Sequence, residues 1–248
     1  MATHQSLHRA VTVLRAFTEA EPALTVTEVA DRTNLHKSTA SRLLAALLDD
    51  GLVRHDRGTG RYSLGMGVVE LAGVALGQID VRGAAMPHME ALAAATGETV
   101  SVVVRRGTEA ITVAHQPGTR ATRHVAWIGR RMPLRSTAAG RAILASMLRR
   151  GDDWRAAAGT DVPGLAERLG AIADAGVAHE DEAFEAGVAA VAAPIPDRTG
   201  AVDAAVALSG PADRFDRPRR DEAATTLVAA ASAIATDLGL REPARDVA

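Results

Sequence analysis

The chain has 248 residues, a net charge of −2 at pH 7 and a hydrophobic fraction of 47%, so it can bury one large core or two smaller ones. The balanced charge excludes a protein coated in basic surface, and any nucleic-acid contact must be a local patch. The absence of cysteine excludes disulfides, thiolate metal ligands and a cysteine nucleophile. The N-terminal stretch does not have the pattern of a signal peptide, and the most apolar stretches, 66–79 and 186–195, are too short or too interrupted to span a bilayer. We therefore expect a cytoplasmic protein without membrane contact.

The first two predicted helices each begin with a capping signal. Ser6 is a candidate N-cap for a helix whose apolar residues lie on one stripe. Thr25 and Glu28 have the spacing of a capping box, in which each side chain accepts a hydrogen bond from the backbone of the other, and this predicts a short helix through Arg32. A tight turn at 33–35 then leads to the next helix.

The segment 36–51 predicts a third helix with two different faces. One face carries a stripe of alanine and leucine at positions 40, 43, 44, 47 and 48. The opposite face of the first turns carries short hydroxyls and long cations, which suit the phosphates and base edges of a DNA groove. The candidate DNA-contacting residues of this helix are His36, Lys37, Ser38, Thr39, Ser41 and Arg42.

A two-stranded ribbon is predicted after this helix, with strands at 52–55 and 61–65 and a glycine-containing turn at 56–60. Arg54, Arg57 and Arg61 surround its tip and are further candidates for DNA contact. Three helices and a ribbon within 1–65 are typical of a winged helix-turn-helix domain. The alternative is an ordinary amphipathic helix packed beside a hairpin, with no role in DNA binding.

Four separated segments resemble the IclR family of bacterial transcription regulators. They are LTVTEVADRTNLHKSTASRLLAALLDDGLVRHDRGTGRYSLG at 24–65, RRMPLRSTAAGRAILA at 130–145, GVAHEDEAFEAGVAAVAAPI at 176–195 and AAVALSGP at 204–211. The resemblance covers nearly the whole chain, and one departure is His36, which stands where a proline is common in the family. The resemblance implies an N-terminal DNA-binding domain followed by a GAF-like domain that binds a small effector.

The segment 66–79 is predicted as a helix that is apolar nearly all round, and such a helix requires cover on more than one side. It is either buried within its own domain or a linker helix that pairs with its copy in a second subunit. The resemblance implies pairing, so we expect a dimer, or a dimer of dimers, and a near-palindromic operator in double-stranded DNA.

The remainder, 80–248, is predicted to alternate strands with helices. Asp80 caps a helix that runs to Thr96 and that Pro87 bends or breaks near Ala84. Strands are expected at 100–105, 110–115, 124–128, 188–195 and 202–208, and further helices at 136–148, at 163–175 opened by Pro163, and at 219–238. Antiparallel hairpins with helices on their faces predict an α+β domain, and a turn is expected at 197–200.

The helix start within MPLRSTAAG, at 132–140, is the predicted ligand site. Uncovered amides and the helix dipole favour an anion there, and small side chains let a ligand approach the backbone. The alternative is that small residues only let this helix pack tightly on the sheet. The resemblance implies that this loop binds small organic acids, and that 180, 188, 190, 207 and 209 form the other wall. The predicted effector-binding residues are Met132, Ser136, Thr137, Ala138, Ala139, Gly140, Glu180, Val188, Ala190, Ala207 and Ser209.

Three wall residues depart from the commoner family pattern: Glu180 replaces an aspartate, and Ala190 and Ala207 stand where polar residues are frequent. The expected effector is therefore an acid with an apolar or aromatic body, larger than glyoxylate or pyruvate. A strand at 124–128 would place His124 and Trp127 beside the same cavity.

No catalytic, cofactor or metal site is predicted. The acidic run at 180–185 lacks histidines at ligand spacing and is more typical of a solvated loop than of a metal cluster. No nucleophile, base and orienting group come together in the sequence. We predict a ligand-responsive transcriptional regulator of a catabolic or metabolic operon. The alternative is an enzyme acting on a small carboxylic acid, with the helix-turn-helix used only for assembly.

Overall fold

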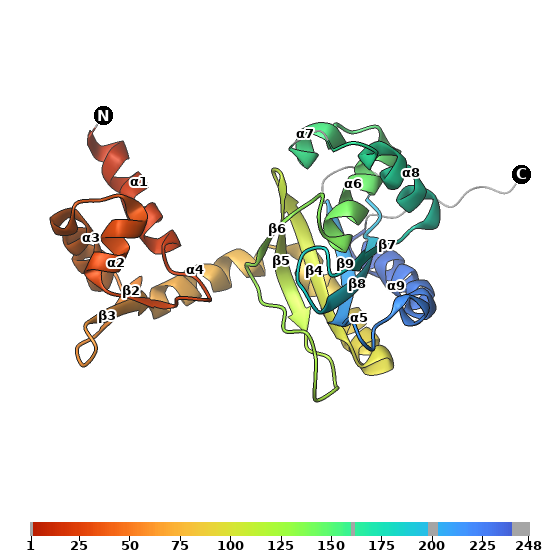
Figure 1. Cartoon of the computed structure of the whole chain (residues 1–248), viewed down its shortest axis with the longest axis horizontal. Helices are drawn as coiled ribbons and strands as arrows, with labels where there is room; N and C mark the ends of the chain where they lie inside the picture. Colours follow the sequence, from red (N-terminus) through yellow and green to blue (C-terminus); the bar gives the residue numbers. More distant parts are fainter. Residues whose placement is uncertain (1, 160–161, 198–202, 240–248) are drawn as a thin grey trace, which may run out of the picture. The chain divides into compact units, whose positions relative to one another are not determined.

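The computed structural model describes residues 2–159, 162–197 and 203–239. The chain divides into two compact units, Met1–Gln78 and Ile79–Ala248 (Figure 1). The predicted linker segment 66–79 falls almost wholly within the first unit. Residues 198–200 of the turn expected at 197–200 lie outside the described part of the chain.

The first unit packs three helices against a small antiparallel sheet of order β1-β3-β2. Its elements before residue 65 are α1 (Ala2–Arg15), β1 (Ala23–Leu24), α2 (Val26–Thr33), α3 (Lys37–Asp49), β2 (Val53–Asp56) and β3 (Arg61–Leu64). The capping box at the start of α2 is confirmed: Thr25 Oγ1 accepts from Glu28 N at 3.3 Å, and Glu28 Oε2 accepts from Thr25 N at 2.7 Å. Ser6 is not an N-cap, because α1 begins at Ala2 and includes it.

Helix α4 (Met66–Gly77) buries none of its residues in the described chain. This overturns the alternative of a helix buried in its own domain. Its start is fixed to the end of α3: Gly67 N donates to Gly51 O at 3.0 Å, and a Cβ on Gly65 would lie 2.2 Å from the same oxygen. Only glycine allows this close approach at position 65.

The second unit is an α+β domain built on a six-stranded antiparallel sheet of order β6-β5-β4-β9-β8-β7. Its elements are α5 (Asp80–Thr96), β4 (Thr99–Arg106), β5 (Glu109–Gln116), β6 (Arg131–Pro133), α6 (Ala138–Arg150), α7 (Trp154–Ala158), α8 (Leu165–Ala175), β7 (Ala178–Asp181), β8 (Val188–Pro194), β9 (Ala204–Pro211) and α9 (Arg217–Asp237).

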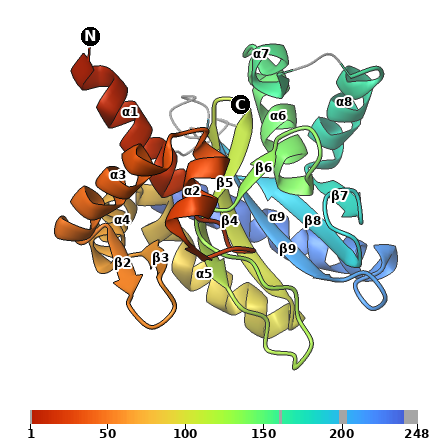
Figure 2. The same cartoon turned by 60° about the vertical axis from the view of Figure 1, so that its left-hand side comes forward.

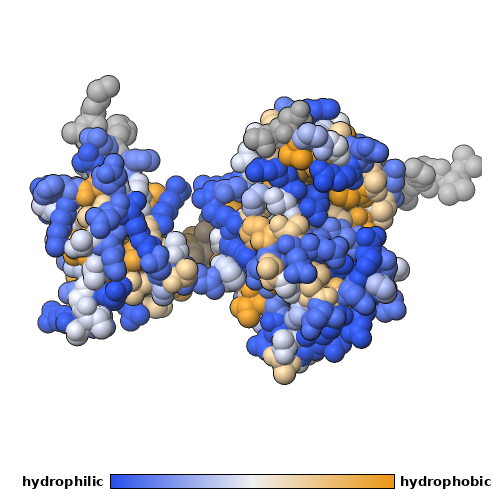
Figure 3. Space-filling model, viewed as in Figure 1, coloured by the Kyte–Doolittle hydropathy of each residue, from blue (hydrophilic) through white to orange (hydrophobic). Residues whose placement is uncertain are grey.

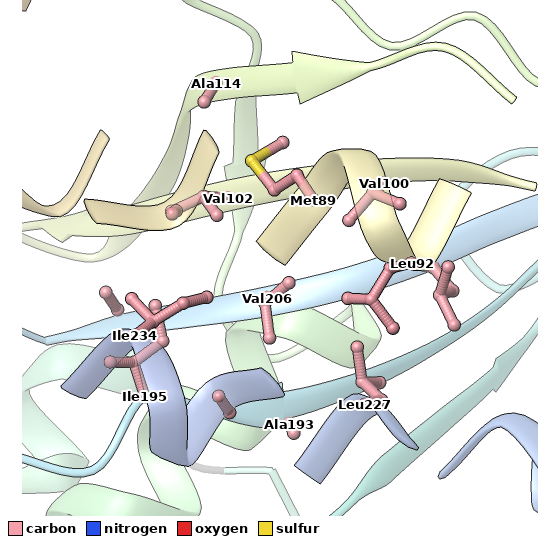
Figure 4. Close-up of a cluster of buried hydrophobic side chains, with 14 of the residues drawn as sticks. Met89, Leu92, Val100, Val102, Ala114, Ala193, Ile195, Val206, Leu227 and Ile234 are labelled. Atoms are coloured by element: carbon pink, nitrogen blue, oxygen red, sulfur yellow. The ribbon is translucent and has the colours of Figure 1, made fainter. Parts of the chain in front are cut away.

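Successive side chains along each strand point to opposite faces of the sheet, and each face is part of a separate hydrophobic core. On one face, Val100, Val102 and Val206 meet Met89 of α5 and Leu227 of α9 (Figure 4). The other face packs against α6, and α7 and α8 pack against α6 in turn, so helices cover both sides of the sheet (Figure 2). The residues at this second face are Val103, Ala110, Ala178, Ala192, Ala205 and Ala207. Small residues let α6 lie close to the strands.

Several predicted boundaries in the second unit are wrong. Helix α5 continues through Pro87, because Ala85 and Met89 are buried on either side while Pro87 itself is exposed. The N-cap of α5 is Ile79, not Asp80. The segment 124–128 forms no strand. Helix α8 starts at Leu165 after an N-cap at Gly164, not at Pro163. The short elements β6, α7 and β7 were not predicted, since segments of three to five residues show no clear periodicity.

Candidate DNA interface and ligand cavity

Helix α3 has one buried and one exposed face. Ala40, Leu44 and Leu47 are buried in the core of the first unit. Lys37 and Arg42 are exposed on the other side, and neither makes a hydrogen bond or ion pair with another described residue. Ser38 and Ser41 are also exposed, and Thr39 is half-buried. These side chains can therefore reach a partner outside the chain.

His36 is the N-cap of α3. Its Nδ1 accepts a hydrogen bond from Ser38 N at 3.4 Å and lies 2.9 Å from Ser38 Oγ. The histidine thus replaces the usual short polar cap. Its role in the structure is to begin the helix, although its ring remains exposed.

The three arginines of the ribbon occupy different environments. Arg57 is exposed at the tip and has no partner among the described residues, whereas Arg54 Nε donates to Ser63 Oγ at 2.8 Å. Arg61 donates to both carboxylate oxygens of Glu28 at 3.2 Å and to Ala23 O at 2.7 Å. Its guanidinium therefore ties the ribbon to α2, and contact of Arg61 with DNA stays a prediction.

Asp56 organises the turn at the ribbon tip. Its carboxylate accepts from Thr59 Oγ1 and from Gly58 N, both at 2.8 Å. These hydrogen bonds, led by that of Thr59, hold the pKa of Asp56 below its ordinary value. The tip that presents Arg57 is therefore a structured turn.

The second unit contains a cavity of about 60 Å³ on the sheet face that carries α6. Nine of the eleven predicted effector-binding residues line it: Met132, Thr137, Ala138, Ala139, Glu180, Val188, Ala190, Ala207 and Ser209. The strand register brings distant residues together, because Ala190 pairs with Ser209 and Ser101 pairs with Ala207. The remaining lining residues are Ser101, Val103, Thr112, His124, Ala126, Arg130, Phe184 and Glu185.

Ser136 and Gly140 do not line this cavity. A Cβ on Gly140 would lie 2.2 Å from Leu134 O, so the glycine is required by packing within the chain. At this position the alternative prediction, tight packing of the helix, is the correct one. Ser136 is half-buried in the loop before α6.

The start of α6 already holds a carboxylate of the chain. Glu180 Oε2 accepts from Ala138 N at 2.8 Å, and Glu180 Oε1 accepts from Phe184 N at 3.0 Å. The amide of Gly140 donates to Thr137 Oγ1 at 3.1 Å, while that of Ala139 donates to no described residue. Glu180 is only 7% exposed, and burial raises its pKa. The interpretation of 180–185 as a solvated loop is therefore wrong at Glu180.

A second polar cluster also lines the cavity. Arg130 Nη2 donates to Glu185 Oε2 at 2.5 Å, and His124 Nε2 lies 3.4 Å from Arg130 Nη1 and 3.5 Å from the same glutamate oxygen. His124 Nδ1 lies 2.8 Å from Ser209 Oγ. The predicted position of His124 beside the cavity is confirmed, but Trp127 does not line it.

Arg130 and Glu185 were missed by sequence reasoning. They are separated by 55 positions and pair only because the loop after β7 folds over the segment before β6. The available signal was an arginine two positions before the predicted site at 132–140 and an acidic residue three positions before the wall at 188. Charge alternation of this kind is too common in sequences to identify a site.

No described helix has the length and apolar character needed to cross a membrane. Within the described ranges, no three histidine or acidic side chains gather as a metal-binding group. Hydrophilic residues dominate the visible face of each unit (Figure 3).

Comparison with known proteins identifies both units. Residues 6–57 match the model of the IclR helix-turn-helix domain, and residues 73–236 match that of the bacterial transcriptional regulator IclR C-terminal domain. The chain is 29% identical over 252 residues to the HTH-type transcriptional repressor AllR of Salmonella typhimurium, covering 96% of this chain and 92% of that protein. The AllR repressor of Escherichia coli is 28% identical over 247 residues, with 96% and 91% covered.

Solved structures agree with this match. An IclR homologue from Microbacterium hydrocarbonoxydans, complexed with 4-hydroxybenzoate, is 26% identical with a TM-score of 0.78, covering 95% of this chain and 100% of that one. An IclR family transcriptional regulator from Brucella abortus is 26% identical with a TM-score of 0.72, covering 94% and 92%. The chain therefore belongs to the IclR family of bacterial transcriptional regulators, and it is a ligand-responsive DNA-binding regulator, not an enzyme.

Proposed function

We propose that this regulator represses a catabolic or metabolic operon by binding a near-palindromic operator with the exposed face of α3. The observation that carries the proposal is the pair of unpartnered cations, Lys37 and Arg42, opposite the buried leucines of the same helix. Such a helix fits the major groove, and Arg57 at the ribbon tip reaches the adjacent backbone. Repression is the activity named for the AllR relatives. Because duplex DNA is its target, we place the protein in the cytoplasm.

Self-association through α4 is the second part of the proposal. Met66, Val69, Leu71 and Val74 are 57–69% exposed, on a helix with no residue buried by the described part of the chain. An apolar surface of this kind favours association, and the copy of α4 in a second subunit is its proposed cover. Two identical units related by a two-fold axis would bind two half-sites of a near-palindrome, as a dimer or a dimer of dimers.

The effector of this proposal is a small organic acid with an apolar body. Met132, Val188, Ala190 and Ala207 supply the apolar part of the cavity wall, and Ala139 supplies an amide that donates to no described residue. The related structure from Microbacterium hydrocarbonoxydans holds 4-hydroxybenzoate, an acid of this class. The acid changes DNA affinity only if it binds two arrangements of the protein unequally.

DNA binding by the full chain is the direct test. We would measure fluorescence anisotropy of a labelled duplex that covers the region upstream of its own gene, with an unrelated duplex of equal length as control. We expect preferential binding to the upstream duplex, with an affinity that falls steeply as salt rises. Equal, salt-independent affinity for both duplexes would contradict the proposal.

A further inference from the structure

We propose that Arg130, assisted by His124, binds the carboxylate of the effector, and that Glu185 is an internal carboxylate which the effector displaces. The inference rests on the proposed function, because it presupposes an acid in the cavity. It assigns the charged end of that acid to the cluster of Arg130, His124 and Glu185, and not to the amides at the start of α6.

The guanidinium of Arg130 is held in a fixed orientation. It lies over the ring of Trp127 at 4.3 Å and over that of Phe184 at 4.9 Å, and its side chain is only 15% exposed. An arginine held between two rings presents its N–H groups in one plane, which is the geometry that a carboxylate accepts. In the structure, that position is taken by Glu185.

Charge balance identifies Glu185 as the group that leaves. Arg130 is the one cation among the described cavity residues when His124 is neutral, and burial lowers the pKa of His124 below its ordinary value. Glu180 and Glu185 already contribute two carboxylates, so an added acid would make three negative groups near two cations, Arg130 in the cavity wall and Arg141, whose charge also acts on Glu180. Such an excess of buried negative charge is unfavourable unless one carboxylate moves into water.

Of the two carboxylates, Glu185 is the one able to move. Glu180 is 7% exposed and accepts two backbone amides, those of Ala138 and Phe184. The side chain of Glu185 is 39% exposed, and its hydrogen-bond and ion-pair partners among the described residues are the side chains of Arg130 and His124. Exchange of Glu185 for the effector therefore preserves the ion pair of Arg130 and breaks no backbone hydrogen bond.

A displacement would also enlarge the cavity, whose volume is about 60 Å³. The side chain of Glu185 lines the cavity, so its movement enlarges it. The same movement that removes the competing charge makes room for the body of the ligand.

The test uses benzoate, 4-hydroxybenzoate and phenylacetate, each compared with its uncharged amide. Binding to the full chain is measured by thermal shift and calorimetry for the parent, Arg130→Gln and Glu185→Gln. The matched controls are Arg131→Gln and Glu109→Gln, an exposed ion pair next to Arg130 in sequence but outside the cavity. Unliganded melting and circular dichroism verify that each variant folds.

We expect an acid to bind the parent at least tenfold more tightly than its amide. Arg130→Gln should remove this preference, Glu185→Gln should tighten acid binding severalfold, and the controls should behave as the parent. If Arg130→Gln does not fold, the change in acid affinity of Glu185→Gln is by itself the test of the inference.

Three results would overturn the inference. Acid binding unaffected by Arg130→Gln would place the carboxylate elsewhere and leave the proposed function intact. Acid binding unchanged or weaker in Glu185→Gln would show that Glu185 is no competitor, again without touching the proposed function. If no acid binds the parent or Glu185→Gln while operator binding persists, the acid effector of the proposed function is lost together with this inference.

Discussion

Lys37 and Arg42 are the residues on which sequence recognition should depend. Both are exposed, without partners among the residues described, and opposite the buried face of α3. Replacing either with alanine should weaken operator binding by about 1–3 kcal/mol if it contacts a base edge. Anisotropy titrations with operator and with base-substituted duplexes measure this effect. Arg149→Ala, an exposed arginine of α6 in the second unit, is the charge-matched control and should bind as the parent.

Arg57 and Arg61 should behave differently, although both belong to the ribbon. Arg57→Ala should weaken binding to all duplexes alike and reduce the slope of log affinity against log salt by about 1, because it removes a phosphate contact. Arg61→Ala should instead lower stability, since Arg61 is bound to Glu28 and Ala23. Titrations at several salt concentrations distinguish the two. An altered base preference with an unchanged salt slope in Arg57→Ala would contradict a phosphate role.

At the scale of the element, the capping box should determine the local stability of α2. Thr25→Ala removes the hydroxyl that accepts from Glu28 N and should cost about 1 kcal/mol, whereas Thr25→Ser keeps the cap. Hydrogen exchange of segment 26–33, followed by mass spectrometry, measures the loss. Faster exchange in Thr25→Ser than in Thr25→Ala would be inconsistent with the cap.

The capping box of Thr25 and Glu28 should also make the stability of α2 depend on pH. Hydrogen bonding to Thr25, and then the charge of Arg61, lower the pKa of Glu28 below its ordinary value of 4.5. Because the pKa of Glu28 is lower in the folded than in the unfolded state, its carboxylate stabilises the protein at pH values above the unfolded-state pKa. This stabilisation is lost as the pH falls through the folded-state pKa. Protection of α2 should therefore decrease below about pH 4.5 in the parent and less so in Glu28→Gln.

Helix α4 is the element on which self-association should depend. Leu71→Asp and Val74→Asp place charges on its exposed apolar surface and should shift the protein from a dimer or larger assembly to a monomer. Light scattering after size-exclusion chromatography measures the mass. Ala171→Asp, on the exposed side of α8, carries the same charge change and should leave the assembly intact. A parent that is monomeric at micromolar concentration would exclude the pairing.

For the whole molecule, effector binding and DNA binding should be separable by mutation, because their residues belong to different units. Ala139 lines the cavity and is 6% exposed, so Ala139→Leu should fill it and abolish the thermal shift by an acid. Operator affinity without effector should remain at the parental value. Ala171→Leu on the surface of α8 is the control. Parental effector affinity in Ala139→Leu would place the ligand elsewhere.

The sequence by itself determined the elements whose signals act over a few residues. Thr25 and Glu28 are three positions apart and fix the start of α2 wherever the helix lies. The leucine spacing of α3 and the alternation of β4 likewise predict a buried face without knowledge of the partner. These local patterns, with the family resemblance, gave the winged helix, the α+β class and most of the cavity wall.

The tertiary structure decided whatever depends on partners far apart in the chain. Glu28 meets Arg61 across 33 positions, Glu180 reaches the amide of Ala138 across 42, and Glu185 meets Arg130 across 55. The order of strands and the path of loops set these encounters, and no local pattern encodes them. Burial on both sides of Pro87 likewise keeps α5 continuous against its local propensity. For this reason the sequence located the cavity, and the fold decided which of its charges are already paired.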